Sequence, residues 1–91
     1  MKIYIAVCTY AAEYGSPQVE FAEAFKTKGE EFIRCIESIA REYETGEDCK
    51  PPTEDMLVLP RESLRDRGEY ALNYGDGVNY NWKIVQQELP L

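Results

Sequence analysis

The residues with chemically useful side chains in this 91-residue chain are its carboxylates, its tyrosines and three cysteines, because the sequence contains no histidine. The absence of histidine removes Ser-His and Cys-His catalytic pairs and the commonest metal ligand. Cys8, Cys35 and Cys49 are odd in number and show no Cys-x-x-Cys spacing, so we expect free thiols, no zinc site and a reducing compartment. The adjacent Glu30 and Glu31 fall on the predicted solvent-exposed face of a helix. The sequence therefore predicts no catalytic residue, no metal site, no cofactor and no enzymatic activity.

Acidic side chains gather in residues 42–55, where six acids accompany a single base, Lys50. Such a run is usually a solvated loop, and its alternative role is a docking surface for a basic partner. The net charge of −7, with no run among the ten basic residues, argues against direct nucleic-acid binding. We therefore expect a small acidic interaction or inhibitor protein, of the kind encoded by phages or mobile elements, that binds a basic surface of a partner protein. The predicted partner-binding residues are Glu42, Tyr43, Glu44, Glu47, Asp48, Glu54 and Asp55.

A function from another class stays open at this point. A small-ligand binder or minor enzyme would use a pocket between the second face of the sheet and residues 53–67, with Cys8 or Tyr10 at its mouth. The Gly75-Asp76-Gly77 triplet offers no phosphate site, because the G-x-x-x-x-G-K-S/T spacing and the helix that should follow it are missing.

Length and hydropathy indicate one small domain, which we expect to span residues 1–91. No apolar run approaches the roughly 20 residues of a membrane span. Met1 leads directly into a strand pattern rather than into a signal peptide. The sequence thus predicts a cytoplasmic protein without membrane contact.

Residues 27–46 predict an amphipathic helix with readable ends. Thr27 and Glu30 match a T-x-x-E capping box, so we expect the helix to begin at Lys28, and Gly46 can end it. Cys35 is expected at the boundary of the apolar stripe. The stripe needs a sheet to cover it. It consists of Phe32, Ile33, Ile36, Ile39, Ala40 and Tyr43.

Two strands are predicted before this helix. Residues 2–10 are apolar on both faces, which indicates a central strand, and we expect the Ile/Val face beneath the helix and the Tyr4 face opposite it. Residues 19–25 fit a strand or an extension of the helix. The strand is favoured, because Gly29 weakens a helix and a capping box has no purpose inside one. As a strand, this segment carries Glu23 among apolar residues, which indicates a bulge or a sheet edge.

The second half of the chain predicts a connecting segment followed by a hairpin. Residues 70–74 and 78–84 alternate apolar and polar side chains on either side of a Gly-Asp-Gly turn, and the aromatic side of the second strand is expected in the core. Residues 56–59 fit an edge strand or a lid over the open sheet face. Residues 61–67 fit one or two helical turns.

The segments KIYIAVCTY, Ala24-Phe25 and TKGEEFI resemble a loose group of short β-β-α-β proteins of bacterial and phage genomes. Their pattern is strand, turn, strand ending in V-F-S/T, helix and last strand. The resemblance covers roughly residues 2–44 and 78–88 and departs at a long insertion over residues 47–77. It implies a fold and no particular activity.

These patterns together predict an α+β fold, a small antiparallel sheet of about four strands with one main amphipathic helix packed on one face. The face of the first strand opposite the helix carries Tyr4, Ala6, Cys8 and Tyr10, and a short chain has few segments to cover it. We therefore expect either residues 56–59 or a second copy, in a homodimer, to cover that face.

Overall fold

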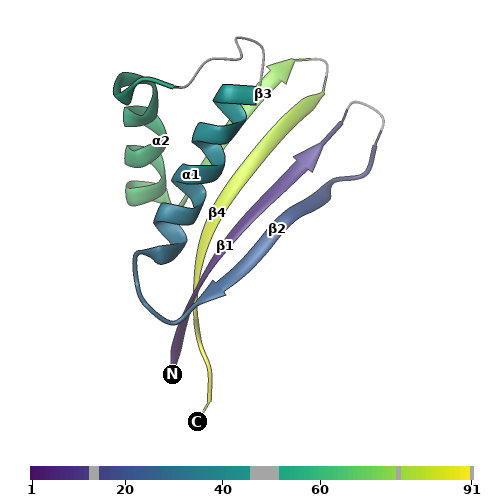
Figure 1. Ribbon diagram of the computed structural model, residues 1–91. Helices are drawn as coiled ribbons and strands as arrows, with labels where there is room; N and C mark the ends of the chain where they lie inside the picture. The colour runs from purple at the N-terminus through teal and green to yellow at the C-terminus, as the bar shows by residue number, and fades with distance from the viewer. Residues whose placement is uncertain (13–14, 46–51, 76, 91) are drawn as a thin grey trace.

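Four antiparallel strands and two helices make up the part of the chain that the structure, a computed structural model, describes: residues 1–12, 15–45, 52–75 and 77–90. The strands form one sheet in the order β2-β1-β4-β3, and both helices cover the same face of it (Figure 1). The predicted α+β class, with about four antiparallel strands and the main helix on one face, is confirmed. The elements are β1 (Lys2–Ala11), β2 (Gln18–Phe25), α1 (Glu30–Thr45), α2 (Glu54–Arg67), β3 (Glu69–Gly75) and β4 (Val78–Glu88).

The face of β1 beneath the helices carries Ala6 and Cys8, so the predicted orientation of this strand is wrong. Both side chains are buried, and Cys8 lies opposite Trp82 in the register with β4. The indole Nε1 of Trp82 donates a hydrogen bond to Ser38 of α1 at 2.9 Å. The large aromatic side chains of β4 need the helical cover, and the β1–β4 register places Ala6 and Cys8 beside them. The open face of β1 carries Ile3, Ile5 and Val7.

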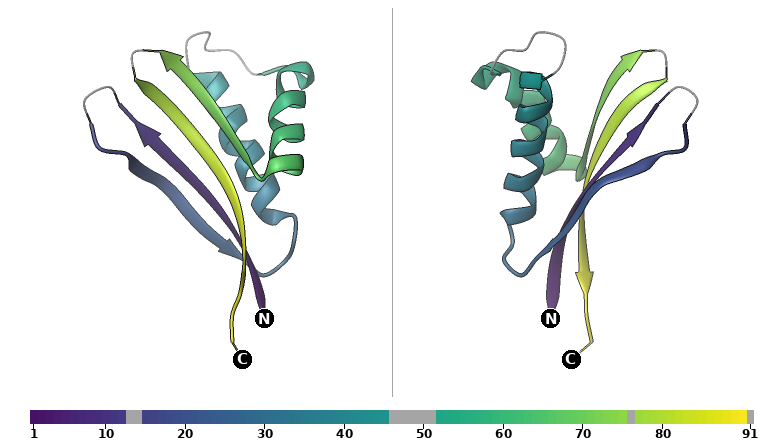
Figure 2. Two further views of the ribbon diagram at one scale, coloured as in Figure 1. Left: turned by 180° about the vertical axis from the view of Figure 1, so that it is seen from behind. Right: turned by 45° about the vertical axis from the view of Figure 1, so that its right-hand side comes forward.

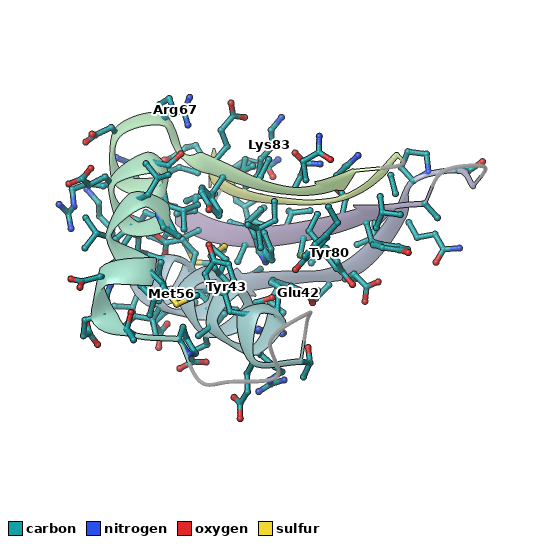
Figure 3. The ribbon with its side chains drawn as sticks, turned by 90° about the horizontal axis from the view of Figure 1, so that it is seen from above. Glu42, Tyr43, Met56, Arg67, Tyr80 and Lys83 are labelled. Atoms are coloured by element: carbon teal, nitrogen blue, oxygen red, sulfur yellow. The ribbon has the colours of Figure 1, made fainter. Side chains whose placement is uncertain are left out.

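In this orientation of β1, the Tyr4 face is no longer a reason to expect self-association. The face that carries Tyr4 is covered by α1 and α2 rather than exposed to a second copy. Figure 3, seen from above, shows Lys83 on the side of the sheet away from the helices, and the β1–β4 register places Val7 opposite Lys83. The uncovered face of the sheet is therefore the Ile/Val face, with Lys83 as a charged neighbour.

The strand reading of β2 is confirmed, and so is the sheet edge that Glu23 indicated. A bulge is also present, but it lies three residues earlier in the strand. Cys8 pairs with Phe21 and Thr9 with Val19, which leaves Glu20 as the extra residue of the bulge. Edge position and bulge together let β2 carry charged side chains on its helix-facing side.

The predicted capping box at the start of α1 is wrong, and the helix begins at Glu30 rather than at Lys28. The backbone N–H of Gly29 donates to both carboxylate oxygens of Glu31, at 3.2 and 3.0 Å. The N–H of Glu30 donates to the backbone carbonyl of Thr27, not to its hydroxyl. Gly29 has a φ of 106°, which side chains strongly disfavour. A reversal at Gly29 thus takes the place of the capping box.

Three side chains of α1 lie elsewhere than the helical stripe predicted. Glu31 is buried with 5% of its surface exposed, and Cys35 is fully buried rather than at a boundary. Ile33, which was placed in the core, is 56% exposed. The buried stripe is therefore rotated toward Glu31, Cys35 and Ile39, because α1 also packs against α2.

Residues 56–59 belong to the helix α2, so the edge-strand alternative is wrong, whereas Leu57 does help to cover the Ala6 and Cys8 face as the lid alternative expected. Leu57, Pro60 and Leu64 are buried at helical spacing, so the apolar run belongs to a helix that continues through Pro60. Proline lacks the N–H that an interior helical position donates, which is why the sequence suggested a break there. The helix ends at Gly68, whose φ is 72° and whose N–H donates to the Leu64 carbonyl at 3.0 Å.

The hairpin of β3 and β4 is confirmed, with Gly75 opposite Val78 beside the turn. Its aromatic side lies in the core, where Trp82 is 1% exposed. Figure 2 shows the turn ends of both strand pairs bending away from α1, while the chain termini lie at the other end of the sheet. The divergence opens the helix–sheet interface at the end where α1 finishes.

Candidate functional site

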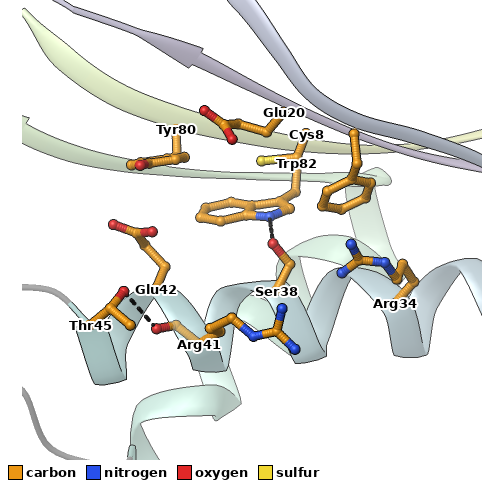
Figure 4. A pocket seen from close by; sticks show the side chains of 10 residues that line it. Cys8, Glu20, Arg34, Ser38, Arg41, Glu42, Thr45, Tyr80 and Trp82 are labelled. Atoms are coloured by element: carbon orange, nitrogen blue, oxygen red, sulfur yellow. Dashed lines mark hydrogen bonds between the residues drawn. The ribbon is translucent and has the colours of Figure 1, made fainter.

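A cleft of about 260 Å³ opens between α1 and the diverging ends of the strands (Figure 4). Its floor is aromatic. The rings of Trp82 and Tyr80, which line it, stack with centroids 5.8 Å apart. Tyr10, outside the lining, packs against Tyr80 with centroids 4.9 Å apart. The hydrogen bond from Trp82 to Ser38 fixes the floor to the helix. The cleft therefore has an aromatic base that is tied to α1 by a hydrogen bond.

Carboxylates come from both walls of this cleft. Glu20 comes from the bulge of β2 and Glu42 from the last turns of α1, and Figure 4 shows both at the end of the cleft where Tyr80 lies. A β-bulge redirects a side chain relative to simple alternation. Glu42 is held in place on its own wall by the Tyr74 hydroxyl, which donates to its Oε1 at 3.1 Å.

Glu20 and Glu42 lie close enough to the floor of the cleft to shift the pKa values of two groups there. Burial is the main cause that raises the pKa of the Cys8 thiol to about 11, and Glu20 and Glu42 raise it further. The pKa of the Tyr80 hydroxyl is raised by burial first and then by the same two glutamates.

Two arginines, Arg34 and Arg41, also line the cleft, and they differ in their ion pairing. The Nε of Arg34 lies 3.0 Å from Oε1 of Glu23, and its guanidinium carbon lies 3.9 Å from the centroid of the Phe21 ring. Arg34 is therefore held by an ion pair and an aromatic ring. Arg41 makes no ion pair within the described ranges. The charged residues that line the cleft are thus two acids, Glu20 and Glu42, and two bases, Arg34 and Arg41. Glu23, outside the lining, pairs with Arg34.

Neither buried thiol is set up as a nucleophile at neutral pH. Cys8 keeps its proton because burial, Glu20 and Glu42 all oppose the thiolate. Burial also raises the pKa of Cys35 to about 12. Both are free thiols, as predicted, whereas Cys49 lies outside the described residues. Over the same ranges, no group of three or more His, Cys, Asp or Glu is placed to hold a metal ion.

The predicted partner-binding residues at the end of α1 separate in the structure. Glu42 lines the cleft. Tyr43 turns toward the sheet instead, where its hydroxyl lies 3.0 Å from that of Tyr70. Glu44 is exposed. Figure 3 shows Glu42 and Tyr80 close together and Tyr43 nearer to α2. Tyr43 therefore packs against the core, and Tyr80 is the tyrosine that lines the cleft together with Glu20 and Glu42.

Two further predicted residues, Glu54 and Asp55, belong to the start of α2. Glu54 and Asp55 are exposed, and Oε2 of Glu54 lies 2.7 Å from the Nη1 of Arg61. Both stand at the same end of the molecule as the C-terminus of α1 (Figure 1). Glu47 and Asp48 lie outside the described residues.

Sequence reasoning missed Glu20 and Tyr80 as parts of a site. Strict alternation along β2 places Glu20 on the opposite face from Phe21, and only the bulge brings both to the same cleft. Tyr80 was assigned to the core with its neighbours, because nothing in the sequence shows that the strands diverge from α1. The one available signal was Glu23, whose charge among apolar residues indicated an irregular or edge strand.

Comparison with protein-family models, with curated proteins and with solved structures finds no match for this chain. None of the helices in the described ranges has the length and apolar character needed to cross a membrane.

Proposed function

We propose that this chain is a small cytoplasmic interaction protein whose cleft receives a basic side chain of a partner protein. The single observation that carries the proposal is the placement of Glu20 and Glu42, from two separate elements, beside the aromatic floor of one cleft. An arginine head group fits this arrangement, because its planar cation stacks on aromatic rings and pairs with carboxylates through a fork of donors.

The size of the cleft favours a side chain over a free molecule. Pockets for small molecules usually measure about 300–1,000 Å³, and the cleft, at about 260 Å³, lies below this range. A single side chain presented by a larger partner needs less enclosed space, because the partner's own surface covers the mouth.

The acids outside the cleft support the encounter rather than the contact itself. Glu44, Glu54 and Asp55 are exposed at the same end of the molecule. Their field attracts a basic surface over about 8–10 Å at ordinary salt and acts mainly on the association rate. Should the basic surface be the partner's own functional site, binding would make this chain an inhibitor of that partner.

The test uses Trp82, the single tryptophan of the chain, as the reporter. The indole N–H resonance of Trp82 is followed by NMR during titration with acetyl-Gly-Gly-Arg-Gly-Gly-amide and with the same peptide carrying citrulline, which is neutral and nearly isosteric. We expect a saturable shift with the arginine peptide that weakens with salt, and little shift with the citrulline peptide.

Paired variants identify the residues responsible. Glu20→Gln and Glu42→Gln together should weaken the arginine peptide by about tenfold or more. Glu62→Gln is the matched control, because Glu62 is an exposed acid of α2 outside the cleft. Equal binding of both peptides, or an unchanged affinity in the double variant, contradicts the proposal.

A further inference from the structure

We propose a second binding site, for an amphipathic zwitterion of the amino-acid type, in a cavity at the opposite end of α1. The cavity lies between the start of α1, the end of α2 and the helix-covered face of β1 and β4. Figure 1 shows that α1 begins and α2 ends at the same end of the molecule. The proposal is independent of the cleft and of the partner that the cleft binds.

The cavity has the size and the walls of a small-molecule site. Its volume is about 460 Å³, within the range of about 300–1,000 Å³ that is usual for such pockets. Four of its lining residues are apolar or aromatic and come from four different elements. They are Tyr4, Phe32, Leu64 and Ile84. A branched aliphatic or aromatic group of a ligand would pack against these side chains.

Glu31 is the unusual polar group of this cavity. Its side chain is buried, with 5% of the residue exposed, and both of its oxygens accept from one backbone N–H, that of Gly29. A carboxylate offers about four acceptor positions. In the described part of the chain, no basic side chain forms an ion pair with Glu31. Since buried charges are normally paired, the ammonium group of a ligand matches this carboxylate.

Two basic side chains at the cavity define the other half of the ligand. Lys28 and Arg65 line it and are exposed, which places them at its mouth. Their charges attract a carboxylate and disfavour a simple amine, while Glu31 disfavours a simple acid. A ligand that carries an ammonium and a carboxylate on one carbon, together with an apolar side chain, satisfies all three groups and the apolar walls.

The first test keeps the protein unchanged and varies the ligand. L-leucine, L-leucinamide and N-acetyl-L-leucine are titrated while the amide resonances of Gly29, Leu64 and Ile84 are followed. We expect saturable shifts with L-leucine. The affinity for each derivative should be lower by about tenfold or more. The derivatives also represent the first and the last residue of a peptide, so they separate a free amino acid from a peptide terminus. Equal binding of either derivative, or no saturable shift with L-leucine, overturns the proposal.

The second test changes the protein. Glu31→Gln keeps an oxygen that can accept from Gly29 but removes the charge, and it should weaken L-leucine by about tenfold. Glu30→Gln is the matched control, because Glu30 is the exposed neighbour outside this cavity. If Glu31→Gln does not fold, the surface variant Lys28→Gln with Arg65→Gln tests the site instead. It should also weaken L-leucine, and Lys26→Gln is its control. Unchanged L-leucine affinity in Glu31→Gln, or in Lys28→Gln with Arg65→Gln, contradicts the proposal. The arginine-peptide response of Trp82 should persist in all of these variants and in the controls.

Discussion

The interface between α1 and the sheet is sealed at its centre and open at the end where α1 finishes, and a further cavity lies where α1 begins. At the centre, Cys35, Ile39 and Trp82 have essentially no exposed surface. At the end where α1 finishes, the strands bend away and leave the cleft with Glu20 and Glu42 on its walls (Figure 2). Sheet curvature, rather than a change in the apolar pattern of α1, therefore creates the candidate site.

The two acids of α1 on the helix-covered side of the sheet, Glu31 and Glu42, have different surroundings. Glu31 lies at the start of α1, where the Gly29 N–H donates to both of its oxygens. Glu42 stands at the open end, where it is half-buried and accepts a hydrogen bond from the Tyr74 hydroxyl. Similar residues on one helix thus have different surroundings, and their substitution should have different consequences.

The largest expected effect separates buried from exposed positions of α1. Ile39→Ala removes a fully buried side chain from the sealed centre and should cost about 2–5 kcal/mol of unfolding free energy. Ile33→Ala, at a position 56% exposed, should change the free energy by about 0.5 kcal/mol or less. Denaturant melts measure both. Similar losses in the two variants would mean that α1 packs with a different face than the structure shows.

Alkaline pH should weaken the sealed centre next most strongly. Burial raises the pKa of Cys8 to about 11 and that of Cys35 to about 12, from 9.0. The native state holds these protons more tightly than the unfolded state does. The stabilisation is therefore complete below pH 9.0 and is lost as pH rises toward these values. The limiting slope is about 1.4 kcal/mol per pH unit for each thiol.

Melts between about pH 8 and pH 10, below the full titration of tyrosine, measure this slope. Cys35→Ala removes one of the two thiols and should give a flatter pH dependence than the unmodified chain. The same slope in both proteins would show that Cys35 does not titrate differently on unfolding.

A smaller effect is expected for Tyr43→Phe. The change removes the hydrogen bond between the Tyr43 and Tyr70 hydroxyls and should cost about 1 kcal/mol. It should leave the arginine-peptide response of Trp82 unchanged, because Tyr43 faces the sheet away from the cleft. A weaker peptide response without loss of stability would return Tyr43 to the partner-binding surface.

The smallest effect on stability is expected at the open end. Glu20→Gln with Glu42→Gln should change the unfolding free energy by about 0.5 kcal/mol or less, because both side chains reach solvent. The same variant should lower the pKa of Cys8, since both glutamates raise it. The pH dependence of thiol alkylation in the folded protein measures this shift. An unchanged profile would indicate that the carboxylates do not face Cys8.

Much of the fold followed from local patterns in the sequence. The Gly-Asp-Gly turn between two alternating runs predicted the β3–β4 hairpin, and Gly29 separated β2 from α1. The helical spacing after Thr27 predicted α1 and its need for a sheet. Such features depend on neighbouring residues alone, so the sequence can report them. Of the candidate site, the same reasoning identified Glu42 but not Glu20 or Tyr80.

Tertiary pairing decided what these patterns left open. Both faces of β1 are apolar, so alternation cannot say which one meets the helices, and the pairing of Cys8 with Trp82 settled the choice. The bulge at Glu20 exists only in the register between β2 and β1. Pro60 lies within α2, where Leu57 and Leu64 are buried in the core. Periodicity in the sequence thus determined the kinds of element, while contacts between distant segments determined their faces, and with them the cleft.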